Sequence, residues 1–194
     1  MGDKESTGCG SVLLAVLAAV VGAFIAAYVK SPCGVYRALN GSFSKLGRHV
    51  DPPRKLVGTN VSFSNCSTAQ QASIKSWMAN GYDRLVAGCW KNLNLPGVDA
   101  KTRERIRDRM VDYLTCEPLQ VVCDAAYCDT NKSSCGFFES ASYYATPKRI
   151  NLCPSNCTGD LTPTVVHEVA HLAEFDVRGW TYETTASPFG SSCS

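Results

Sequence analysis

The sequence predicts an α+β fold, in which an apolar N-terminal helix precedes a disulfide-rich domain of two helices, a small sheet and a buried helix. An uncharged apolar run of 18 residues, 12–29, predicts the first helix. Segments with helical apolar spacing, followed by short segments rich in Val, Ile and Leu, predict the mixed domain. Ten of the 11 cysteines follow the apolar run, which predicts the disulfides.

The apolar run is close to the length that crosses a bilayer. Its 18 residues are at the short end for a transmembrane helix and long for the apolar part of a signal peptide. We favour an uncleaved signal anchor, although Ile25 and Ala27 offer a small-residue pattern to a signal peptidase. A buried helix of a soluble core fits less well, because the run is apolar on all sides. Residues 1–30 are therefore predicted to be a signal anchor that contacts the membrane through residues 12–29, or a signal peptide.

The cysteines indicate on which side of the membrane the rest of the chain lies. Ten is an even number and allows up to five disulfides in an oxidising compartment. Five Asn-x-Ser/Thr sequons fit a secretory route: Asn40, Asn60, Asn65, Asn131 and Asn156. Four basic residues after the apolar run would favour a cytoplasmic position instead: Lys30, Arg37, Lys45 and Arg48. We give the cysteines more weight and expect a domain that is anchored on the extracytoplasmic side, or secreted after cleavage.

Composition and charge narrow the choice of partners and separate a linker from the domain. The net charge is only +2, so nothing indicates a nucleic-acid partner. No Cys-x-x-Cys pair occurs, which favours disulfides over a structural zinc site made of cysteines. Residues 31–65 are rich in Ser, Gly, Pro and Asn and are predicted to form a linker or stalk. The folded domain is then predicted to span residues 66–194.

The domain begins with two predicted helices. Ser67 followed by Gln70 is a capping-box pattern, and the apolar spacing after it predicts a helix over 67–91. A turn at Pro96-Gly97 separates it from a second helix. The later elements are a helix over 99–114, strands over 119–122, 142–145 and 149–152, and a disulfide-pinned loop over 123–135.

The last predicted helix carries the segment His167-Glu168-Val169-Ala170-His171, which is the HExxH arrangement of zinc-dependent peptidases. Thr162 is a plausible N-cap, and Pro163 suits the first helical position. Residues four apart share one helix face, so His167 and His171 can offer their ring nitrogens to one metal ion. Glu168 lies where a carboxylate could take a proton from a zinc-activated water.

A catalytic zinc site has a third protein ligand, which this chain must supply from outside the motif. Glu183 is the favoured candidate, because a turn at Gly179 could return the chain toward the metal ion. Asp176 is the alternative, at the expected end of the helix. Glu174 is one turn past His171 and is expected to be too displaced to bind. His49, far upstream, is expected to be a surface residue.

Three stretches of the domain have an order and spacing found in one peptidase family. They are Cys66 to Gln70 ahead of a long helix, Ile150-Asn151-Leu152-Cys153-Pro154, and Val165-Val166-His167-Glu168-Val169-Ala170-His171-Leu172. Through them the chain resembles the aspzincins, the deuterolysin and peptidyl-lysine metalloendopeptidase family, over roughly residues 66–183. The resemblance implies a zincin-like metallopeptidase domain that holds one Zn²⁺ and acts on a peptide or protein substrate.

The chain departs from that family after the HExxH motif. The family's third ligand is an Asp in the pattern Gly-Thr-x-Asp-x-x-Tyr-Gly, whereas this chain has Gly179-Trp180-Thr181-Tyr182-Glu183. The family's tyrosine, which helps to stabilise an oxyanion, has no aligned counterpart here, and Tyr182 is the nearest candidate for that role. Lysine specificity is therefore not carried over.

The sequence thus predicts a zinc-dependent metalloendopeptidase that hydrolyses peptide bonds through a zinc-activated water, with Glu168 as general base. The alternative is a catalytically inactive, disulfide-rich extracellular module that keeps the HExxH helix and binds another protein.

Overall fold

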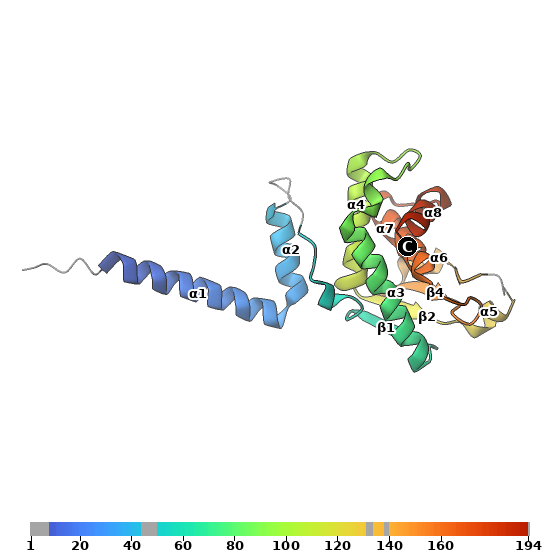
Figure 1. Cartoon of the computed structure of the whole chain (residues 1–194), viewed down its shortest axis with the longest axis horizontal. Coiled ribbons are helices and arrows are strands. Elements are labelled where there is room, and N and C mark those ends of the chain that lie inside the picture. Colours follow the sequence, from blue (N-terminus) through green and yellow to red (C-terminus); the bar gives the residue numbers. More distant parts are fainter. Residues whose placement is uncertain (1–7, 44–49, 131–133, 138–139, 194) are drawn as a thin grey trace, which may run out of the picture. The chain divides into compact units, whose positions relative to one another are not determined.

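The computed structural model describes residues 8–43, 50–130, 134–137 and 140–193, and His49 lies outside them. The chain divides into two compact units, Met1–Val50 and Asp51–Ser194, which are described separately (Figure 1). The predicted α+β class is confirmed, because the second unit combines helices with a four-stranded sheet.

The first unit contains two helices, α1 (Gly8–Lys30) and α2 (Pro32–Phe43). Apolar side chains of α1 are exposed, among them Leu14 and Ile25. Among the described residues, no single helix is long and apolar enough to cross a membrane. Val16–Val29 and Pro32–Leu39 meet the requirement only when they are taken together, as a pair bent by 120°.

The sheet of the second unit contains three parallel strands and one antiparallel strand at its edge. The strand order is β1-β2-β4-β3, with β3 antiparallel to β4. Val121 of β2 is in register with Phe63 of β1 and Ile150 of β4, and Gly136 of β3 is in register with Leu152. The strand bounds are β1 (Val61–Ser64), β2 (Leu119–Val122), β3 (Gly136–Phe137) and β4 (Lys148–Leu152).

Helix α7 (Thr162–Arg178) packs against two other long helices and against the sheet (Figure 1). These two helices are α3 (Thr68–Ala87) and α4 (Ala100–Thr115). Helix α3 begins with a capping box of Ser67 with Gln70, and α4 begins with a side-chain cap by Asp99. Apolar residues from all these elements form one core, including Met78, Met110, Val169 and Ile150. The remaining helices are α5 (Ala125–Thr130), α6 (Ser140–Tyr144), α8 (Glu183–Ser192) and the 3₁₀ turns η2 (Arg54–Leu56) and η3 (Cys89–Asn92).

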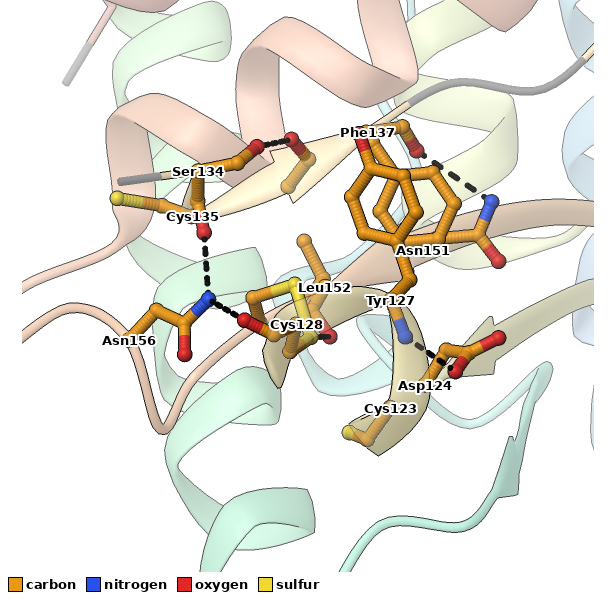
Figure 2. Close-up of a disulfide and its surroundings, with 12 residues drawn as sticks. Cys123, Asp124, Tyr127, Cys128, Ser134, Cys135, Phe137, Asn151, Leu152 and Asn156 are labelled. Carbon is orange, nitrogen blue, oxygen red and sulfur yellow. Dashed lines mark hydrogen bonds between the residues drawn. A yellow bond between two sulfur atoms is a disulfide. The ribbon is translucent and has the colours of Figure 1, made fainter. Parts of the chain in front are cut away.

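The predicted disulfides are confirmed. All ten cysteines that follow the apolar run are disulfide-bonded. Within the second unit the pairs are Cys66–Cys123, Cys89–Cys193, Cys128–Cys153 and Cys135–Cys157. The last two hold the segment around β3 against the chain that follows β4, and the Asn156 amide supports them by donating to the carbonyls of Cys128 and Ser134 (Figure 2).

Most predicted elements occur, but several segments differ from the prediction. Helices α2 and α5 lie in segments predicted to be a linker and a loop, and helix α8 was not predicted. Residues 142–145 belong mostly to a helix, α6, rather than to a strand, because both edges of β4 are already paired, with β2 and β3. Strand β1 lies inside the segment 31–65, for which composition predicted a linker. The short edge strand β3 lies in a segment to which no strand was assigned.

Asp176 joins three elements of the core. Its Oδ2 atom accepts hydrogen bonds from the Tyr113 hydroxyl and from Nε of Arg109, both at 2.6 Å, and Lys148 of β4 lies 3.5 Å from Oδ1. Burial raises the pKa of the Asp176 carboxyl, but the bonds from Tyr113 and Arg109 and the nearby positive charges outweigh burial and hold the pKa below its usual value. The ionised form of Asp176 therefore stabilises the fold.

Replacing Asp176 by Asn should destabilise the second unit at pH 7 by about 1–3 kcal/mol, because the charged acceptor of the hydrogen bonds from Tyr113 and Arg109 is lost. A folded-state pKa below the unfolded one makes this contribution present above the unfolded pKa of about 3.9 and lost as pH falls through the folded pKa. Urea unfolding at pH 7 and pH 3 should show a large difference only at pH 7. Asp83→Asn, which breaks an exposed pair with Arg54, is the control and should change little. An equal loss at both pH values would contradict the assignment.

Candidate metal centre

Helix α7 places the two histidines next to each other at the edge of the core. The helix starts after Leu161, which supplies no side-chain cap, and Pro163 lies in its first turn. Thr162, the predicted N-cap, is instead inside the helix, where its N–H and hydroxyl both donate to Oδ1 of Asp160. Apolar residues on the buried face fix the helix rotation, so that His171 is 5% exposed while His167 is partly exposed.

His167, His171 and Glu183 form a cluster that could hold a metal ion. The two Nε2 atoms are 3.1 Å apart. Oε1 of Glu183 lies 3.2 Å from Nε2 of His171, and Oε2 lies 3.3 Å from Nε2 of His167. Sequence reasoning favoured Glu183 as the third ligand, and the structure brings it to both rings.

The spacing of these atoms fits a small tetrahedral cation. Bonds of about 2.0–2.2 Å from such an ion to nitrogen and oxygen place its ligand atoms about 3.3–3.6 Å apart. The observed separations of 3.1–3.3 Å are close to that range. Two imidazoles and a carboxylate are also the donor types of catalytic zinc sites that keep a fourth position open.

Both rings are suited to act as ligands. Burial lowers the pKa of His167, and the negative charge of Glu183 only partly offsets this. Burial also lowers the pKa of His171, and the neighbouring His167 lowers it further. The neutral imidazole, which is the form that binds a metal ion, is therefore favoured at neutral pH.

Thr181 and Tyr143 support His171 from the side away from the cluster. Nδ1 of His171 lies 2.8 Å from the Thr181 hydroxyl oxygen, and Tyr143 of α6 shares a hydrogen bond with Thr181. When Nδ1–H donates to that oxygen, Nε2 keeps its lone pair for a cation. The sequence contained Thr181 in the Thr-x-Glu pattern, but it gave no signal for Tyr143, which was expected in a strand.

The turn after α7 brings Thr181 and Glu183 back to His171. Gly179 ends the helix with a φ of 80°, a left-handed conformation that glycine adopts without strain. Its N–H donates to the Phe175 carbonyl at 2.7 Å. The turn that sequence reasoning placed at Gly179 is thus confirmed, and the next helix begins at Glu183.

Glu168 lies beside the cluster rather than in it. The residue is 4% exposed, and its Oε2 atom has no hydrogen-bond partner among the described residues. Burial, and then the charge of Glu183, raise the pKa of the Glu168 carboxyl to about 8. Together with His167, it lines a cleft of about 440 Å³ between β3 and α8, which also includes Gly136, Thr164 and Gly190.

Two other predicted site residues lie elsewhere. Asp176 is bound to Arg109 and Tyr113, and it is not one of the clustered ligands among the described residues. Tyr182, the predicted oxyanion helper, is 55% exposed, with its ring 6.0 Å from the Arg178 guanidinium. Glu174 does not reach the cluster either, as expected, and is instead fully buried.

With Zn²⁺ as the probe of this candidate site, replacing Glu183 by Ala should weaken metal binding by more than about 100-fold, a larger loss than removal of a supporting residue causes. Asp176→Asn, one helical turn and a half past His171, is the matched control and should keep the affinity. Competition with a chromogenic chelator measures both variants. The reverse result, with zinc lost in Asp176→Asn and kept in Glu183→Ala, would show that Asp176, and not Glu183, is the third ligand.

Comparisons of the chain with models of protein families, with curated proteins and with solved structures find no match. The candidate site therefore rests on the arrangement of its own residues: two histidines and a glutamate whose ligand atoms lie within 4.8 Å of one another.

Proposed function

We propose that this chain is a zinc-dependent metalloendopeptidase. One observation carries the proposal: a buried carboxylate with an unpartnered oxygen, Glu168, shares a cleft with His167 of the His167/His171/Glu183 cluster. A buried carboxylate oxygen without a hydrogen-bond partner costs free energy. An arrangement of this kind is expected where the carboxylate takes part in proton transfer.

Each residue then has a role in hydrolysis. His167, His171 and Glu183 would hold the zinc ion, which would supply a water of lowered pKa and polarise the scissile carbonyl. Glu168 takes the proton from that water and delivers it to the leaving amine. The positive charge of a bound cation would favour the ionised form of Glu168 and so oppose the effect of burial on its pKa.

The edge of the sheet supplies a place for an extended peptide. The Cys153 N–H donates to the Cys135 carbonyl, and the register of β3 with β4 makes Cys135 and Phe137 the residues whose backbone groups face β4. The N–H and carbonyl of Gly136 therefore face away from β4, along the edge of the sheet, where the carbonyl also accepts a hydrogen bond from the Ser134 hydroxyl. A substrate strand paired there would run past Glu168 and His167, which line the same cleft as Gly136.

The disulfides support an oxidising compartment for this activity. Ten bonded cysteines support a domain that works on the oxidising side of a membrane. The exposed apolar side chains of α1 support attachment through the N-terminal segment, or its removal as a signal peptide.

Replacing Glu168 by Gln should lower kcat/KM for casein by about 10²–10⁴-fold, because proton transfer is lost while size and shape are kept. Zinc content, measured by mass spectrometry, should stay at one ion per chain. Glu104→Gln, at an exposed position of α4, is the matched control. Undiminished cleavage by the Glu168→Gln variant would exclude Glu168 as the general base. If the wild-type chain binds zinc and cleaves nothing in a peptide library, the alternative of an inactive binding module holds.

Replacing Gly136 by Ala should reduce hydrolysis by at least about tenfold and leave zinc affinity unchanged. A Cβ atom at this position would lie 2.9 Å from Oε1 of Glu168 and 2.7 Å from the Thr164 methyl, so it would displace the general base and not the ligands. The hydroxyl of Ser134 donates to the Gly136 carbonyl, so the Ser134→Ala variant is the control for local disturbance of β3. Full activity in Gly136→Ala would show that Glu168 tolerates the displacement.

A further inference from the structure

Glu174 is a fully buried carboxylate on α7, one turn beyond His171. Its Oε1 atom accepts hydrogen bonds from Arg178 and from the Thr185 hydroxyl, both at 2.7 Å. Its Oε2 atom accepts a hydrogen bond from the backbone N–H of Tyr182 at 2.8 Å. Both oxygens are thus partnered, and Arg178 balances the charge.

Two of these donors flank the metal-ligand candidate. Tyr182 immediately precedes Glu183, and Thr185 follows it by two residues. Tyr182 is also the N-cap of α8, and it makes no capping bond with its own side chain. The bonds to Glu174 therefore fix the first turn of α8 relative to α7, the helix that carries both histidines.

Glu183 depends on this support for its position relative to α7. The Ser187 hydroxyl also donates to its Oε2 atom at 3.3 Å, but Ser187 lies on the same helix, α8, and does not tie Glu183 to α7. The Glu183 side chain is 73% exposed, so packing does not define its position. It must nevertheless place one oxygen 3.2 Å from His171 and the other 3.3 Å from His167. A metal site needs its ligands held to within about 0.5 Å, and buried hydrogen bonds to the backbone provide that precision.

The carboxylate contributes to fold stability, because an apolar side chain at position 174 would leave Arg178, the Tyr182 N–H and the buried Thr185 hydroxyl without this acceptor. Its hydrogen bonds also fix a position. Helix α8 has other attachments to the core, through buried Ala186 and Phe189 and through the Cys89–Cys193 disulfide at its far end. What Glu174 adds is a fixed position for the backbone on both sides of Glu183.

We propose that Glu174 is a positioning residue of the metal centre, which acts through Glu183 and does not touch the cation. This inference rests on the zinc site of the proposed function but not on hydrolysis. Charge-assisted bonds from the carboxylate to the Tyr182 N–H and the Thr185 hydroxyl hold Glu183 opposite the two rings.

The test is a double-mutant cycle on zinc affinity, measured by chelator competition with the full chain. Glu174→Gln should weaken zinc binding by about 10–100-fold, the range typical of residues that orient a ligand. In a Glu183→Ala background, the same substitution should have no further effect, because the ligand through which it acts is gone. The visible spectrum of the Co²⁺-loaded chain should change in Glu174→Gln and resemble that of Glu183→Ala. Asp176→Asn, which changes the next carboxylate of α7, should leave affinity and spectrum unchanged.

The outcomes separate this inference from the proposed function. Wild-type affinity in Glu174→Gln overturns the positioning role and leaves the zinc site intact. An equal loss in the Glu183→Ala background also overturns it, because Glu174 would then act on the whole helix. A wild-type chain that binds no zinc overturns both proposals. If Glu174→Gln does not fold, Thr185→Val removes one of the three bonds and should show a smaller loss of the same kind, abolished by Glu183→Ala.

Discussion

The burial of α7 is the constraint on which the rest of the second unit depends. This helix lies against α3, α4 and the sheet, so each polar group on it must find a partner inside the protein. Asp176 finds one in α4, Glu174 in the first turn of α8 and His171 in Thr181. Through these three sets of hydrogen bonds, the surrounding elements are all attached to α7. Glu168 is the exception, and its unpartnered oxygen lies where the cleft begins.

The same constraint explains how far sequence reasoning could go. The α3 and α4 helices and strands β2 and β4 are visible in the sequence because each has an apolar pattern and a cap or turn of its own. Strand β1 has no such signal, since its partner β2 lies more than 50 residues away in the chain and alternating serines resemble a linker. Strand β3, with two residues, is too short to show any period.

Within the site, the motif and the turn at Gly179 were enough to name both histidines and Glu183. Helix geometry could have excluded Asp176 as the third ligand, because five residues of about 100° each place it about 140° from His171 around the helix. The role of Glu174 was not accessible in the same way. It depends on where the chain returns after the turn, and nothing in the sequence states that the Tyr182 N–H and Thr185 hydroxyl meet one carboxylate.

Helix α8 is held at both of its ends, by Glu174 near its start and by the Cys89–Cys193 disulfide just after its last residue. Glu183 lies at the end of α8 that Glu174 holds, and the disulfide closes the opposite end. The covalent bond therefore limits how far the whole helix can move from the core, so that the first turn of α8 is fixed by hydrogen bonds and the last by a cross-link.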